Sequence, residues 1–86
     1  MLTTDRAIGV RVKAIFGLLR SAPSARATFV RGEHLWLQYR RAACTAGASS
    51  YEGGSAQPVE YLSCTVGRNK THLTDLATIR RTLSQH

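Results

Sequence analysis

Apolar side chains recur along the first segment at the spacing of one helical face. Four of them lie at successive intervals of four, three and four residues: Ile8, Val12, Ile15 and Leu19. Thr4 or Asp5 is placed to cap the start of this helix. Pro23 ends it, because the residue before a proline avoids the α region. The pattern predicts a helix over about residues 4–21.

A second and longer amphipathic segment begins with Ser24 as its cap and runs to about Ala48. Two adjacent rows of apolar residues repeat every seven positions, namely Val30, Leu37 and Cys44 beside Phe29, Trp36 and Ala43. Three more residues widen this predicted apolar face: Leu35, Tyr39 and Ala42. The polar positions between them are expected to face solvent: Arg31, His34, Gln38 and Arg41.

A polar run over residues 49–55 interrupts the helical pattern, and its adjacent Gly53 and Gly54 predict a turn. A third helix is expected from about Gln57, with an apolar stripe of Val59, Leu62, Val66, Leu73, Leu76 and Leu83. Asn69 falls on the same stripe, where a polar residue usually fixes register. The sequence therefore predicts one all-α domain over residues 1–86. Its last two helices would form an antiparallel hairpin across the Gly-Gly-Ser turn.

The two cysteines lie on opposite sides of this turn. Cys44 precedes the glycine pair by about nine residues and Cys64 follows it by about ten. Positions equidistant from a hairpin turn face each other, and a disulfide needs Cα atoms within about 7 Å. A Cys44–Cys64 disulfide is predicted, although Cys64 falls beside the apolar stripe rather than on it. Free buried thiols, or zinc ligation together with His34 and His72, remain as alternatives.

Several residues between Glu33 and Leu76 recur together in one family of bacterial proteins. The matching elements are Trp36-Leu37-Gln38-Tyr39-Arg40, Cys44, Tyr51-Glu52-Gly53-Gly54-Ser55, Cys64 and Leu76. In this combination the chain resembles the lysozyme-inhibitor LprI-like family, and the family-like core spans about residues 24–84. Where the family usually has a Thr-x-x-Arg step after its second cysteine, this sequence carries Asn69 and His72.

The resemblance implies a secreted, periplasmic or lipid-anchored helical domain with paired cysteines, and lysozyme or another envelope protein as the partner. Such a module would block the substrate cleft with a loop or a helix end, and Arg or Ser would engage the catalytic carboxylates. The chain shows no convincing signal peptide. The apolar run over residues 14–19 is short and is followed at once by Arg20, so an amphipathic helix is favoured.

Charge complicates the lysozyme hypothesis. The chain has ten Arg and two Lys against five acidic residues, for a net charge of +7. Animal-type lysozymes are themselves strongly basic, so long-range repulsion would slow association. An alternative is an Arg-rich domain for nucleic acid or an anionic surface, through Arg20, Arg26, Arg31, Arg40, Arg41, Arg80 and Arg81. A solvated basic surface, or a degenerate structural relative without activity, is the third interpretation.

Catalytic chemistry has little support in the sequence. His34, His72 and His86 have no acidic partner at a telling spacing, and the five carboxylates are scattered. We therefore expect a non-enzyme without cofactor or metal.

The most distinctive cluster is Trp36, Tyr39 and Arg40. Trp36 is expected in the core, with Arg40 stacked over it and reaching Glu52 or the turn carbonyls. The alternative is an exposed binding hot spot. The Tyr51–Ser55 segment is either a binding loop or only a structural turn.

Overall fold

The computed structural model describes residues 2–85, so the first and last residues of the predicted domain, including His86, lie outside it. Three α-helices form the described chain: α1 (Thr3–Leu18), α2 (Pro23–Ala48) and α3 (Ala56–Ser84). A single 3-10 turn, η1 (Ser49–Tyr51), follows α2, and residues 2–85 contain no strand. The predicted all-α class with three helices is confirmed.

The helix ends differ from the prediction in two places. α1 ends at Leu18 rather than near residue 21, because the next residues form a turn in which the Ala22 amide donates to the Leu19 carbonyl (2.9 Å). α2 starts at Pro23, not after a Ser24 cap. Proline suits the first helical position because the amide it lacks would have no helical partner there.

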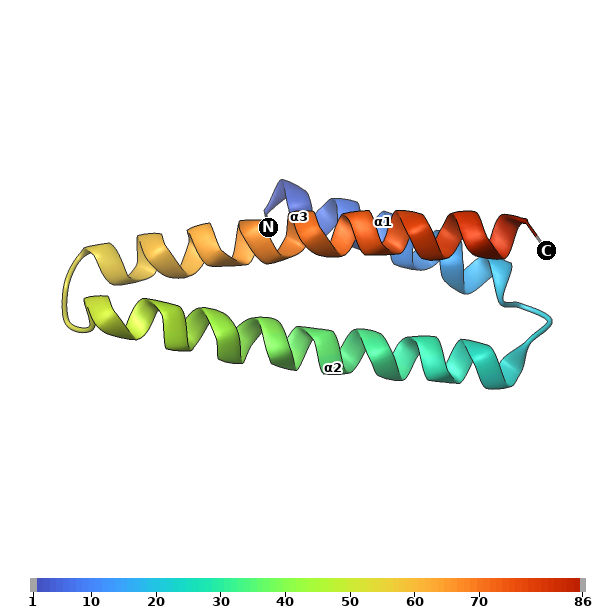
Figure 1. The fold of residues 1–86 in the computed structure, drawn as a ribbon, viewed down its shortest axis with the longest axis horizontal. Helices are drawn as coiled ribbons and strands as arrows, with labels where there is room; N and C mark the ends of the chain where they lie inside the picture. The colour runs from blue at the N-terminus through green and yellow to red at the C-terminus, as the bar shows by residue number, and fades with distance from the viewer. Residues whose placement is uncertain (1, 86) are drawn as a thin grey trace.

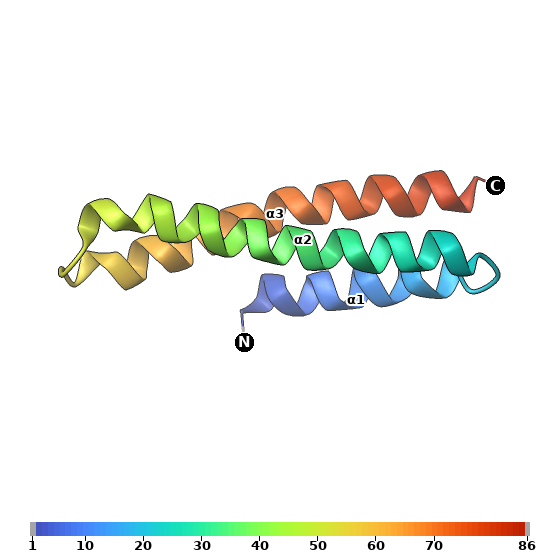
Figure 2. The same ribbon diagram turned by 90° about the horizontal axis from the view of Figure 1, so that it is seen from below.

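The chain reverses direction twice, so that α2 runs back along α1 and α3 returns along α2 (Figures 1 and 2). Both α1 and α2 pack against α3, and their backbones approach each other less closely. The molecule is a rod of 49 × 21 × 19 Å with a radius of gyration of 15.2 Å. A compact chain of this length would have a radius of gyration of about 12 Å. One end of the rod consists of α2 and α3 alone, because α1 begins alongside the middle of α3 (Figure 2).

The apolar core lies mainly between α1 and α3. The buried members are Ile8, Ile15, Leu19 and Leu76, and Val12, Phe29, Trp36, Leu73 and Leu83 pack around them half-buried. The stripe predicted for the first helix is therefore confirmed.

The apolar face predicted for the second helix is wrong in part. Leu35, Leu37 and Tyr39 are exposed on α2, at 55%, 43% and 55% respectively. The face that turns inward carries Trp36, Arg40 and Cys44, which are spaced by four residues. α1 is shorter than α2 and packs chiefly on α3, so no third helix covers the outer apolar row.

The stripe predicted for the third helix is also wrong in its first half. Val59 and Leu62 are exposed, whereas the buried positions are Thr65, Asn69, His72 and Leu76. These four residues are spaced by four, three and four positions, so they form one regular helical face that is mostly polar. The true face also accounts for Cys64, which lies next to Thr65 rather than on the Val59–Leu62 line.

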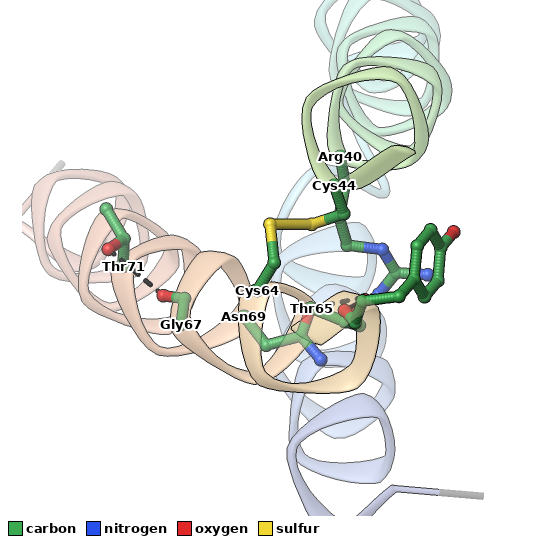
Figure 3. The surroundings of a disulfide bond; sticks show 8 residues. Arg40, Cys44, Cys64, Thr65, Gly67, Asn69 and Thr71 are labelled. Atoms are coloured by element: carbon green, nitrogen blue, oxygen red, sulfur yellow. Dashed lines mark hydrogen bonds between the residues drawn. A yellow bond between two sulfur atoms is a disulfide. The ribbon is translucent and has the colours of Figure 1, made fainter. Parts of the chain in front are cut away.

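The disulfide between Cys44 on α2 and Cys64 on α3 is present, with the two Cα atoms 5.4 Å apart (Figure 3). The prediction of the pair is confirmed, and its two alternatives, free thiols and zinc ligation, are excluded. The bond closes the two-helix end of the rod, where α1 provides no packing.

Replacing Gly32 by alanine should stabilise the fold by about 0.5–1 kcal/mol, because alanine is the better helix former. Gly32 lies in the interior of α2, and an added Cβ would meet no atom within 4 Å. Urea unfolding of the oxidised protein measures the change. The exposed Ala42, also in α2, provides the control, since Ala42→Gly should destabilise by a similar amount. A Gly32→Ala protein less stable than the parent would contradict this prediction.

Candidate functional site

A polar cluster joins the three helices near the middle of the rod. Arg40 Nη1 on α2 donates to Asp5 Oδ1 on α1 (2.8 Å) and to Asn69 Oδ1 on α3 (2.9 Å). Asn69 Nδ2 in turn donates to Thr4 Oγ1 (2.9 Å) and to Asp5 Oδ1 (3.0 Å). Asn69 is fully buried, and its amide is satisfied at both ends, which is the condition for a stable buried polar group.

Next to this cluster, an aromatic stack connects α2 and α3. The rings of Trp36 and His72 are parallel within 9°, with centroids 3.7 Å apart. The His72 Nε2 donates to the carboxylate of Glu33, at 2.9 and 3.1 Å from its two oxygens. Arg40 completes the stack, with its guanidinium carbon 5.3 Å from the Trp36 ring centroid. The stack and the cluster fix α2 against α3 through polar groups in place of a large apolar interface.

Trp36 and Arg40 therefore face inward, where they contact side chains of the other helices. Arg40 stacks over Trp36 as predicted, but its expected contact with Glu52 or the turn carbonyls is wrong. Arg40 lies one turn before Cys44 on α2, and Figure 3 shows its side chain pointing away from the disulfide. It reaches Asp5 because α1 begins beside it. Thr4 and Asp5 likewise bond to Asn69 and do not cap α1, whose N-cap residue is Leu2 without a side-chain cap.

The remaining residues of the predicted binding set are accessible. Tyr39 lies 55% exposed on the outer side of α2, away from the cluster. Tyr51 is 45% exposed, and Glu52, Gly53, Gly54 and Ser55 are all exposed at the end of the rod. The structure thus separates Tyr39 from Trp36 and Arg40, with which the sequence pattern had grouped it.

The turn is closed by its own backbone hydrogen bonds. The Gly54 amide donates to the Tyr51 carbonyl (3.0 Å), and the Gln57 amide donates to the Gly54 carbonyl (3.3 Å). Gly53 has φ +79°, a left-handed conformation that residues with a Cβ rarely adopt. A Cβ on Gly54 would come within 3.3 Å of the Tyr51 carbonyl oxygen. Gly53 is thus favoured by its backbone conformation and Gly54 by a close approach to Tyr51, and the turn presents Tyr51 and Glu52 at the end of the rod.

Charge is segregated along the rod, which the sequence analysis missed because it counted charge over the whole chain. We define the tip as residues 42–67, the part that contains the disulfide and the turn. The tip has no Lys or Arg; its charged residues are Glu52 and Glu60, so it carries −2. All twelve cations and the other three carboxylates lie outside it, which leaves +9 for the remainder. A scan of charge in sequence windows would have found this division.

Residues 2–85 contain no group of three or more His, Cys, Asp or Glu side chains arranged to hold a metal ion. No helix in the same part of the chain is both long and apolar enough to cross a membrane.

Comparison with known proteins supports one family. The family described as "Lysozyme inhibitor LprI" matches residues 5–76, which include most of α1, all of α2 and the tip. Neither the curated proteins nor the solved structures gave a match.

Proposed function

The chain belongs to the lysozyme inhibitor LprI family, and we propose that it is a non-catalytic protein that binds and inhibits lysozyme through its tip. The observation that carries this proposal is the absence of any cation between residues 42 and 67. A basic enzyme is repelled by the +9 part of the rod and attracted by the −2 tip, so encounter is steered to the tip. Segregated charge thus weakens the objection that a net charge of +7 raises, because the partner meets the acidic end first.

The shape of the tip also suits insertion into a substrate cleft. Only two helices and one short turn form it, and the Cys44–Cys64 bond joins those helices. Backbone hydrogen bonds within the turn restrict its conformations before binding, which reduces the entropy lost on association. The exposed hydroxyls of Tyr51 and Ser55 are suited to hydrogen-bond the carboxylates of a glycosidase, and Glu52 is suited to cations around the cleft.

A hollow beside the turn offers a further contact. It has a volume of about 330 Å³ and is lined by uncharged residues, among them Thr45, Pro58 and Tyr61. Partner side chains that enter it would meet no desolvated charge, which favours affinity.

The proposal places the protein outside the cytoplasm. Disulfides persist in oxidising compartments, and this one holds the end of the rod that is proposed to act. The family resemblance points to the same location, periplasmic or secreted.

Inhibition should be tested with the oxidised protein against lysozyme acting on a peptidoglycan suspension, followed by the loss of turbidity. We expect stoichiometric excess to slow the reaction. Glu52→Lys should raise the concentration needed for half inhibition at least tenfold, because it reverses one of the two tip charges. Asp75→Lys is the matched control. It changes the net charge equally at an exposed position on α3 outside the tip, and should alter inhibition less than twofold.

Two results would oppose the proposal. Undiminished lysozyme activity at a large excess of the parent protein would exclude inhibition. Equal weakening by Glu52→Lys and Asp75→Lys would exclude the tip as the binding site, because only the overall charge would then matter. Circular dichroism and thermal melts of both variants check that each retains the fold.

A further inference from the structure

We propose that the end of the rod opposite the tip holds a binding site for a free, single-chain anionic amphiphile, such as a fatty acid. The site is an open pocket of about 560 Å³ between the end of α1 and the first half of α2. This volume is within the range of small-molecule sites, about 300–1,000 Å³. The site is distinct from the tip and does not depend on the proposed inhibition.

The floor of the pocket is hydrocarbon. Phe16 at the end of α1 and Pro23, Ala27 and Val30 on α2 provide it. The pocket is open because the backbones of α1 and α2 approach each other less closely than either approaches α3. Phe16 is 37% exposed, which leaves ring surface available to a ligand. An alkyl chain that covers this floor removes apolar surface from water, worth about 0.8 kcal/mol per buried methylene group.

The edge of the pocket is basic, with no carboxylate among the lining residues. Arg20, Arg26, Arg31 and His34 line it. Arg26 is held in place: its guanidinium carbon lies 3.4 Å from the Phe16 ring centroid, and its Nε donates to the Phe16 carbonyl (3.3 Å). The terminal Nη groups of Arg26, with those of Arg20 and Arg31, are suited to bind a carboxylate head in bidentate fashion. Charge complementarity therefore selects an anion whose tail is apolar.

An acyl chain fits this pocket better than a peptide or a second copy of the protein. The side chains of the floor offer no hydrogen-bonding groups, so a peptide backbone pressed onto it would lose hydrogen bonds to water. A methylene chain has no such groups to satisfy. A second copy would bring its own +9 segment close to three arginines unless it docked by its tip.

The experiment is isothermal titration of the oxidised full chain with laurate below its micelle concentration. Dodecyltrimethylammonium, with an alkyl chain of nearly the same length and a cationic head, should bind at least tenfold more weakly. Butyrate, with the same head and a short chain, should show no measurable binding. Equal binding of the two twelve-carbon amphiphiles, or binding of butyrate as tight as that of laurate, would overturn the proposal.

Matched variants on α2 locate the site. Arg31→Gln should weaken laurate binding about fivefold or more, whereas Arg41→Gln, with the same charge change at an exposed position outside the pocket, should change it less than twofold. Ala27→Phe places a ring in the pocket and should weaken binding at least tenfold. Equal effects of the two Arg variants, or no effect of Ala27→Phe in a protein that melts normally, would overturn the assignment.

Two further measurements separate other occupants. Sedimentation of the ligand-free protein should show a monomer; a dimer abolished by Ala27→Phe would assign the pocket to a second copy. Vesicles of phosphatidylglycerol should bind the parent and Ala27→Phe proteins alike. If Ala27→Phe abolished laurate and vesicle binding together, the acyl chain that enters the pocket would belong to a membrane lipid. The assignment to a free amphiphile would then be wrong.

Discussion

Replacing both cysteines by alanine should lower the free energy of unfolding by about 3 kcal/mol, because the bond closes a loop of about 21 residues in the unfolded chain. In a domain of this size that corresponds to a fall in melting temperature of about 15 °C. The effect is large relative to total stability because only six hydrophobic residues of the described chain are buried, and four of them lie between α1 and α3. The α2–α3 end has little else to hold it together.

Thermal melts provide the measurement. They compare the parent, the Cys44→Ala/Cys64→Ala protein and the parent in reductant. Thr45→Ala/Ser63→Ala is the control, since both residues are exposed neighbours of the cysteines and should change stability by less than about 0.5 kcal/mol each. A cysteine-free protein as stable as the oxidised parent would show that the bond adds nothing. We also expect the Cys44→Ala/Cys64→Ala protein to inhibit lysozyme more weakly, because the bond would no longer join the two helices of the tip.

Asn69→Leu should destabilise the protein by about 3 kcal/mol, although leucine is apolar and has the same branched side-chain skeleton. Asn69 is fully buried, accepts from Arg40, and donates to Thr4 and Asp5. Leucine would leave the half-buried Thr4, Asp5 and Arg40 with fewer partners where water has limited access. The loss therefore comes from groups left unpaired and not from a cavity.

Urea unfolding at neutral pH tests this effect, with Thr74→Ala as the control on the exposed side of α3. Asn69→Asp provides a second variant of nearly the same shape. Its carboxylate could accept from Arg40 but could not donate to Thr4 or Asp5, and it would stand about 3 Å from the Asp5 oxygen, so it too should destabilise. Equal stability of Asn69→Leu and the parent would show that the polar cluster makes no net contribution.

The two halves of the rod differ in what stabilises them and in the charge that they carry. The half that holds α1 has an apolar core and a basic surface, whereas the tip depends on a disulfide and carries only negative charge. A basic partner and an anionic amphiphile would therefore be drawn to opposite ends of the molecule. The two proposals can fail independently, because Glu52→Lys and Ala27→Phe change sites at different ends.

Local pattern was sufficient to predict the features that depend on neighbours in sequence. The stripe Ile8–Leu19 is confirmed because its spacing is that of one helical face and α1 buries that face. The Cys44–Cys64 pair is confirmed because the glycine turn between them places both at similar distances from the reversal. The breaks at Pro23 and at the glycine pair also follow from local backbone preferences.

The tertiary structure alone decided which faces of α2 and α3 are buried. Hydropathy selected Leu35, Leu37, Val59 and Leu62, which are exposed. Of the buried polar residues Thr65, Asn69 and His72, the predicted stripe included only Asn69. A polar residue can be buried when its partners arrive from distant parts of the chain. Thr4 and Asp5 are more than sixty residues from Asn69. Helical periodicity relates residues only three or four positions apart, so the sequence determined the helices and their disulfide, and packing determined what they enclose.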